Sequence, residues 1–168
     1  QTYYISVTAY DTSNNESGHS NEVNGVATDG APIYTVATNP TGLHVVIDGT
    51  SYTAPKTFSW TAGSTYTLAV SSPQSGTTGT QYVYASWSDG GSQSHTITVP
   101  SSAATYTANF VAQYSLTTAT NLAGAGTVTP SGTSWYNSGQ SVSIQATANT
   151  GYQFTGWTGT GTGSYTGT

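Results

Sequence analysis

Cysteine and methionine are absent from the 168 residues, and charged side chains make up only 4% of them. Without cysteine, the chain forms neither a disulfide nor a thiolate metal site. An average domain carries about a quarter charged residues, so Thr, Ser, Asn, Gln and Gly must cover this surface. Neutral, hydroxyl-rich side chains suit β-strands that face water better than they suit soluble helices. The composition therefore predicts an all-β protein.

Positive charge is also nearly absent, because Lys56 is the only lysine or arginine and the formal net charge is −5. Nucleic-acid binding needs a cluster of cations that replaces the counterions of the phosphates. Attraction to an anionic membrane surface has the same requirement. No apolar run approaches the length of a membrane span. We therefore expect no nucleic-acid partner and no membrane insertion.

Two pairs of tryptophans recur at a similar spacing. Trp60 and Trp135 lie 75 positions apart, and Trp87 and Trp157 lie 70 positions apart. Alternating, strand-like segments surround each pair. The pattern predicts a diverged tandem repeat of small β-modules whose cores are anchored by the four tryptophans. Tandem arrays of this kind more often have structural, spacer or binding roles than catalytic ones.

Residues 1–29 contain two alternating segments, residues 2–10 and 20–28, on either side of a polar turn. They predict an antiparallel hairpin, which is only marginally stable in water by itself. The strand around Val7 and the following Ser20-Asn21-Glu22-Val23 resemble the end of a fibronectin type III domain. The resemblance implies a domain of which this stretch supplies only the last strands.

Residues 30–112 contain several short alternating segments separated by strong turn signals. Asn39-Pro40-Thr41-Gly42 ends one segment, and Asp48-Gly49 is a strong signal for a two-residue hairpin. Together with Ala54-Pro55 and Ala62-Gly63, these turns resemble the PEGA family of bacterial surface β-domains. The resemblance implies a complete β-module with no shared active site.

Residues 113–168 carry a Gly-rich stretch at 124–132 and the pattern Gly151-Tyr152-x-Phe154-x-Gly156-Trp157. They resemble the divergent InlB B-type bacterial repeat. A strand is expected at residues 141–146, and no closing strands are expected after Trp157, which leaves an unpaired edge. The fold class is thus tandem small β-sandwich or immunoglobulin-like modules. The modules span residues 1–29, 30–112 and 113–168, and the first and last are incomplete.

No catalytic, cofactor-binding or metal-ligating residues are assigned. The six acids and three histidines lack the spacing of an acid–base pair, a triad or a metal site. Asp48 and Asp89 are most simply turn residues, although a Ca²⁺ site at Asp89 and an isopeptide bond at Lys56 are alternatives. The histidines are expected at solvent-facing positions; they are His19, His44 and His95.

These observations predict a structural or adhesive module of a bacterial extracellular surface protein or fibre, and not an enzyme. Its partners are then neighbouring domains of a longer chain or further copies of itself. Self-assembly would proceed by β-strand complementation, in which the N-terminal strand of one copy completes the C-terminal module of the next. The side chains that would enter the acceptor belong to Tyr3, Tyr4, Ile5 and Val7.

The alternative function is a carbohydrate-binding accessory module of a secreted enzyme, with a glycan as partner. Flat aromatic rings bind the apolar faces of sugars. Tyr82 and Tyr84 share a face by the two-residue period of a strand, so either Tyr84 or Trp87 is expected to be exposed for stacking. Exposed rings on one sheet face would favour this alternative, and four buried tryptophans would count against it.

Overall fold

The computed structural model describes residues 2–21, 23–26 and 31–161. Every regular element in these ranges is a β-strand, and they contain no helix. The predicted all-β fold class is confirmed. The strands form several small sheets, as expected for small β-modules.

The N-terminal strands form an antiparallel hairpin. β1 (Thr2–Ile5) pairs with β2 (Val23–Val26), so that Thr2 lies opposite Val26 and Ile5 lies opposite Val23. Asp11 organises the connecting loop, because its carboxylate accepts hydrogen bonds from the backbone amides of Ser13 and Asn15. Among the described residues, these two strands pair only with each other.

Two sheets pack face to face in residues 31–112. One sheet has the strand order β10 (Ser94–Thr98), β7 (Thr65–Ala69), β4 (His44–Ile47) and β5 (Thr50–Thr53). The other has the order β6 (Lys56–Phe58), β3 (Tyr34–Asn39), β11 (Ala104–Thr118), β9 (Thr80–Trp87) and β8 (Gln74–Ser75). All neighbours are antiparallel except β3 and β11, which are parallel.

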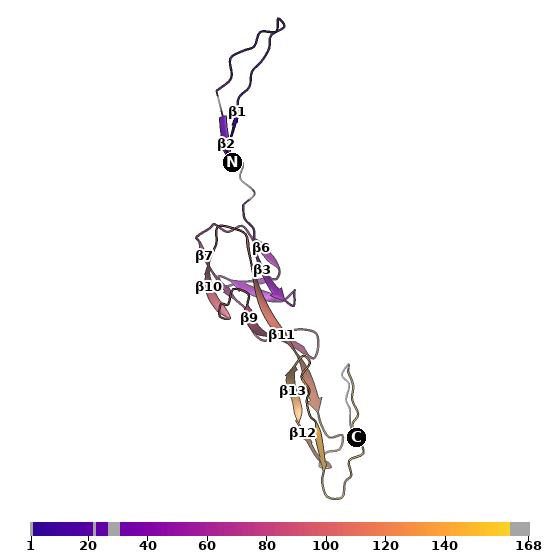
Figure 1. Cartoon of the computed structure of the whole chain (residues 1–168). Helices are drawn as coiled ribbons and strands as arrows, with labels where there is room; N and C mark the ends of the chain where they lie inside the picture. The colour runs from indigo at the N-terminus through magenta and orange to yellow at the C-terminus, as the bar shows by residue number, and fades with distance from the viewer. Residues whose placement is uncertain (1, 22, 27–30, 162–168) are drawn as a thin grey trace.

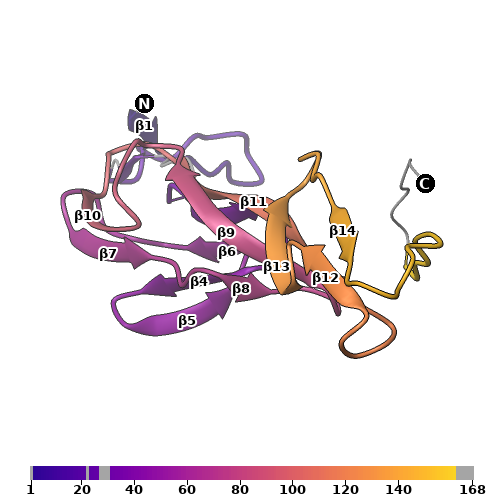
Figure 2. The ribbon, with the colours of Figure 1, turned by 90° about the horizontal axis from the view of Figure 1, so that it is seen from below.

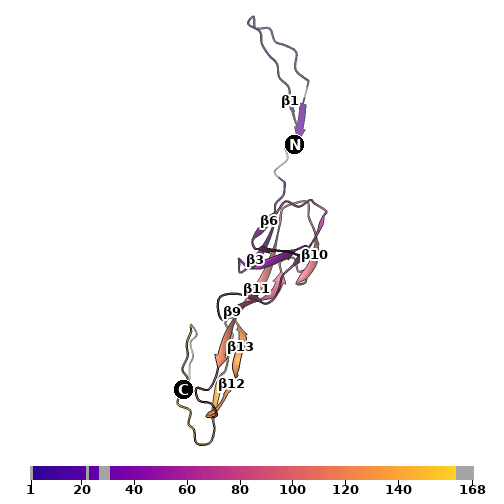
Figure 3. The same cartoon turned by 180° about the vertical axis from the view of Figure 1, so that it is seen from behind.

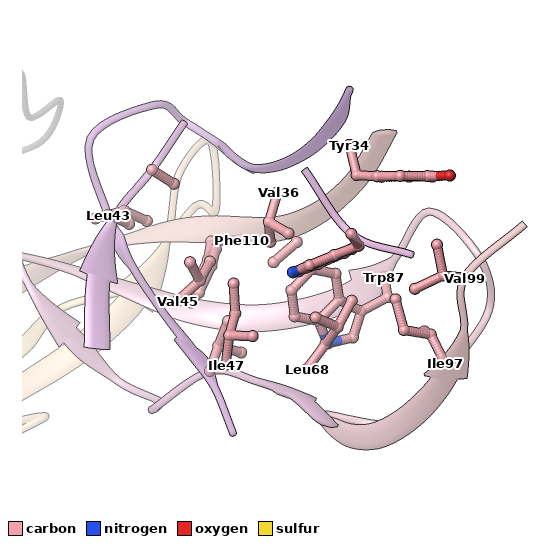
Figure 4. Close-up of a cluster of buried hydrophobic side chains, with 14 residues drawn as sticks. Tyr34, Val36, Leu43, Val45, Ile47, Leu68, Trp87, Ile97, Val99 and Phe110 are labelled. Carbon is pink, nitrogen blue, oxygen red and sulfur yellow. The ribbon is translucent and has the colours of Figure 1, made fainter. Parts of the chain in front are cut away.

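The hydrophobic core lies between these two sheets (Figure 4). Val45 and Leu68 come from one sheet and Val36 from the other, and all three are fully buried. Each such side chain contributes about 1.5–3 kcal/mol by leaving water. Trp60 closes one part of the core, because its ring stacks on Phe58 and Tyr66 at centroid distances of 4.7 and 4.4 Å.

The Asp48-Gly49 turn forms the predicted two-residue hairpin between β4 and β5. Ile47 lies opposite Thr50, and the φ angles of Asp48 and Gly49 are 45° and 81°. Positive φ at both turn positions belongs to the hairpin type whose twist matches that of the strands. The Asp48 carboxylate also accepts a 2.7 Å hydrogen bond from the backbone amide of Thr67, which ties the turn to β7.

β11 is the longest strand and extends beyond the sandwich. Its first part pairs with β3 and β9, and its last part, from Gln113 to Thr118, pairs with β13 (Gly132–Asn137). Figures 1 and 3 both show it running out of the sandwich alongside β13. The boundary predicted between residues 112 and 113 therefore falls inside a continuous strand.

The remaining strands of the C-terminal module form a separate pair. β12 (Gly126–Thr129) is antiparallel to β14 (Gln145–Ala148), with Gly126 opposite Ala148. Figure 2 shows this pair beside β13. The strand expected at residues 141–146 is not formed as predicted, because β14 begins only at Gln145 and residues 141–144 are in no strand.

The tandem equivalence predicted from the tryptophans is not reproduced. Trp60 lies in a loop and is 9% exposed, whereas Trp135 lies on β13 and is 41% exposed. Trp87 ends β9 in the core, whereas Trp157 is in no strand and is half-buried. Neighbouring residues of a strand point to opposite faces. Tyr136 occupies the sheltered face of β13, so Trp135 must point outward.

Candidate interaction surface of the C-terminal module

The junction between the sandwich and the C-terminal module is a three-strand arrangement of β9, β11 and β13. Gln113 lies at its centre, directly opposite Gln81 on one side and Asn137 on the other. The Gln81 side-chain amide donates to Gln113, and the Gln113 amide donates to Asn137, both at 2.8 Å. We call these three side chains the amide ladder. The two modules are thus joined by backbone pairing and by side chains, without an intervening loop.

The outer face of β11 and β13 carries polar side chains around one exposed ring. Directly opposite residues of antiparallel strands share a face, so Trp135 shares its face with Ser115. On one side of this pair stands the amide ladder. On the other side, the hydroxyls of Thr117 and Thr133 are 2.8 Å apart and hydrogen-bonded. We call this surface the Trp135 face.

Two hollows lie in the C-terminal module, and the end of β11 borders only the first of them. One, of about 420 Å³, is lined in part by Leu116, Ile144 and Trp157. The other, of about 350 Å³, is lined in part by Val128 and Phe154. No hydrophobic side chain among residues 113–161 is buried, whereas the sandwich buries 14. Apolar side chains of the C-terminal module therefore line these hollows without forming a closed core.

Charge is confined to the first part of the chain. The last Asp, Glu, Lys, Arg or His in the sequence is His95, so residues 96–168 contain none of these five residue types. Charged residues, Lys above all, are a common device by which proteins protect sheet edges from unwanted pairing. β13 has no such residue, and in the described part of the chain only β11 pairs with it. Among the described residues, no second strand therefore pairs with its other edge.

The predicted assembly strand lies in and just after β1. Ile5 and Val7 are each 66% exposed, so their apolar side chains face solvent. The backbone of Tyr3 and Tyr4 belongs to β1, but their side chains lie outside the described residues. The structure brings this strand together with β2 and not with the C-terminal module of its own chain.

The residues predicted for sugar stacking, Tyr84 and Trp87, both point into the sandwich. Trp87 is 3% exposed, and Tyr84 packs edge-on against Phe110. In a regular strand, Tyr84 and Trp87 would point to opposite faces because they are three residues apart. The register between β9 and β11 shifts, however, so that Ala85 has no partner. This bulge resets the alternation and turns both rings inward. Neither ring is therefore presented as a stacking platform.

A pairing that the sequence spacing did not reveal joins Asp89 and His95. The Nε2 atom of His95 lies 2.9 Å from the Asp89 carboxylate, and its Nδ1 atom lies 2.8 Å from the Ser92 carbonyl. Each ring nitrogen thus lies within hydrogen-bonding distance of an oxygen acceptor. His95 is also half-buried against Trp87, which corrects the expected solvent-facing position.

The surroundings of Asp89 lower the pKa of its carboxyl and leave His95 unsuited to act as a general base. Burial raises the pKa of its carboxyl, but hydrogen bonds from the Gly91 amide and from His95 outweigh burial and hold the pKa below its ordinary value. A Cβ atom on Gly91 would run into the His95 ring, so glycine is required for this close approach. With both ring nitrogens engaged, His95 is not placed to activate a nucleophile. We call this group the Asp89–His95 latch.

The other candidate residues remain apart. His19 and His44 are exposed, as expected. Lys56 lies on β6 with its Nζ atom 6.0 Å from the centre of the Tyr52 ring. Within the described ranges, no three acids or histidines are grouped as a metal site would require. In the same ranges, no helix has the length and hydropathy needed to cross a membrane.

Comparison with known proteins identifies one region of the chain. Residues 116–168 match the divergent InlB B-repeat domain. Modules of this kind are non-catalytic and usually occur in bacterial surface proteins, which indicates a cell-surface location; no catalytic domain is found. The comparisons give no support to the fibronectin type III or PEGA resemblances. No curated protein and no solved structure matches the chain.

Proposed function

We propose that the chain is a rigid structural module of a bacterial extracellular surface protein or fibre. The observation that carries the proposal is the strand β11, which belongs to the sandwich and to the C-terminal module at once. Modules joined by flexible linkers move independently. Modules that share a strand keep a fixed orientation, because bending between them would break the pairing on both sides of Gln113.

The polar junction supports this mechanical role. Strand pairing at Gln113 is reinforced by the amide ladder, and the Ser138 amide donates a 2.8 Å hydrogen bond to the Ala112 carbonyl. Each such bond contributes about 0.5–1.5 kcal/mol net. A set of them acting together resists separation of β13 from β11. A spacer that holds an adhesive or fibre-forming partner away from the cell needs this stiffness.

We further propose that copies associate by strand addition. The donor is the segment that carries Ile5 and Val7, and the acceptor is the unpaired edge of β13 together with the hollow lined in part by Leu116 and Ile144. Residues 2–10 and residues 113–168 contain no charged side chain. Burying the donor in the acceptor therefore places no ion in an apolar environment, which would be costly. An added strand would satisfy the open edge and cover Leu116 and Ile144.

Electron microscopy of the purified protein tests the association. We expect regular filaments with the full chain, because a donor and an acceptor at different sites propagate without closing. Deletion of residues 1–10 should abolish them. Ser51→Asp on β5, an exposed position in the sandwich far along the chain from both elements, serves as the matched control and should assemble normally. Filaments that persist after the deletion would contradict strand addition.

A further inference from the structure

We propose that the Trp135 face binds neutral glycans, with the indole of Trp135 as the stacking ring. The face comprises Ser115 and Trp135, the amide ladder, and the hydroxyl pair Thr117–Thr133. It is distinct from the strand-acceptor edge, which lies along the rim of β13, and of its residues only Thr117 also lines one of the hollows. The inference is independent of the proposed function.

The first argument is the exposure of the indole. Trp135 is 41% exposed on β13. Its cross-strand partner is Ser115, whose short side chain cannot cover the ring. Among the described residues, no other aromatic ring lies within stacking distance of Trp135. The ring therefore presents apolar surface to solvent, which is the surface that the C–H face of a pyranose covers.

The second argument is the hydrogen-bonding capacity that flanks the ring. Asn137 and Thr133 stand two residues on either side of Trp135 on the same face, a separation of about 7 Å in a strand. The Asn137 side-chain oxygen accepts from Gln113, which leaves its amide hydrogens directed away from the ladder. On the other side, the Thr117–Thr133 pair shares one hydrogen bond between two hydroxyls. One hydroxyl hydrogen and several lone pairs are thus open to sugar hydroxyls.

The third argument is charge. No Asp, Glu, Lys, Arg or His occurs in residues 96–168, so β11 and β13 carry no charged side chain at neutral pH. Anionic sugars, sulfated glycans and nucleic acids need cationic partners, and this face offers none. The ligand class that matches a single ring among neutral amides and hydroxyls is a neutral hexopyranose chain.

The experiment is a titration of ¹⁵N-labelled protein with cellohexaose, chitohexaose and maltohexaose, followed through the indole N–H signals in two-dimensional NMR. We expect at least one of the three to shift the Trp135 signal at about millimolar concentration, the range expected for one ring with a few hydrogen bonds. The Trp87 signal should not move, because that ring is in the core.

Two variants locate the effect. Trp135→Ala should abolish the backbone shifts of β11 and β13, and Trp135→Tyr should retain them with weaker affinity. Tyr114→Ala is the matched control, because Tyr114 is an exposed aromatic residue on the opposite face of β11. Absence of shifts with all three sugars, or binding that survives Trp135→Ala, would overturn the proposal. Neither outcome bears on rigidity or on filament formation.

Discussion

The four tryptophans divide into two that build the sandwich and two that do not. Trp60 and Trp87 are buried among the aromatic and aliphatic side chains of the core. Trp135 faces solvent, and Trp157 lines both hollows of the C-terminal module. Sequence position suggested four equivalent anchors, but a residue's burial depends on the face it occupies. A stability measurement on single variants separates the two groups.

Trp87→Ala should lower the free energy of unfolding by about 3–5 kcal/mol, the usual cost of removing a large buried ring. Trp135→Ala should change it by less than about 0.5 kcal/mol, as an exposed position allows. Urea unfolding followed by circular dichroism measures both. Equal losses from the two variants would show that Trp135 is part of a core.

The Asp89–His95 latch predicts a pH-dependent contribution to stability. Because the pKa of Asp89 is lowered in the folded protein, its contribution is present above the ordinary value and lost as the pH falls through the lowered one. Asp89→Asn should therefore destabilise the sandwich at pH 6 by about 1 kcal/mol. The difference from the parent should close below pH 3.8, the ordinary value for this carboxyl.

A double-mutant cycle with His95→Gln tests whether the latch itself is responsible. The effect of Asp89→Asn should shrink when His95 has already been replaced, because the two side chains share one interaction. If the two losses simply add at pH 6, the carboxylate acts through the Gly91 amide alone.

At the scale of elements, local patterns predicted individual strands well and their connections less well. The Asp48-Gly49 turn was predictable because positive φ at two positions demands such residues. The continuity of β11 also left a signal. Tyr106, Ala108 and Phe110 face the core at every second position, and the same alternation continues to Leu116. The boundary predicted between residues 112 and 113 followed the family resemblance and therefore divides this continuous strand.

Other features could not be predicted because they depend on partners distant in the sequence. The bulge at Ala85 is defined only by the register between β9 and β11, yet it decides that Tyr84 and Trp87 share a face. The Trp135 face likewise exists only once β13 lies beside β11. The alternation of apolar and polar residues within one strand does not specify which face of that strand will be exposed to solvent.

Hydrogen exchange tests whether β11 is one structural element. The amides of Gln113 and Tyr114 should exchange as slowly as those of Ala108 and Asn109, because strands pair with β11 on both sides at these positions. The β12–β14 pair has only two strands and should exchange faster. Fast exchange at residues 111–115 would indicate a hinge at the predicted boundary.

For the whole molecule, the strand shared by the sandwich and the C-terminal module is the basis for the proposal that the two form one stiff body. The C-terminal module adds an uncharged surface with an open edge, an apolar inner side and a polar outer face. A surface protein built from such units would reach outward without bending and would carry neutral contact surfaces along its length. The proposed function depends on a junction that does not bend.

Spin-label distance measurements test that claim most directly, because the chain has no native cysteine. Labels at Ser51→Cys on β5 and Thr133→Cys on β13 occupy exposed positions on either side of the junction. The matched control carries Gly-Ser-Gly inserted between Ala112 and Gln113. We predict one narrow distance distribution for the parent chain and a broad one for the insertion. A parent distribution as broad as that of the insertion would contradict the account.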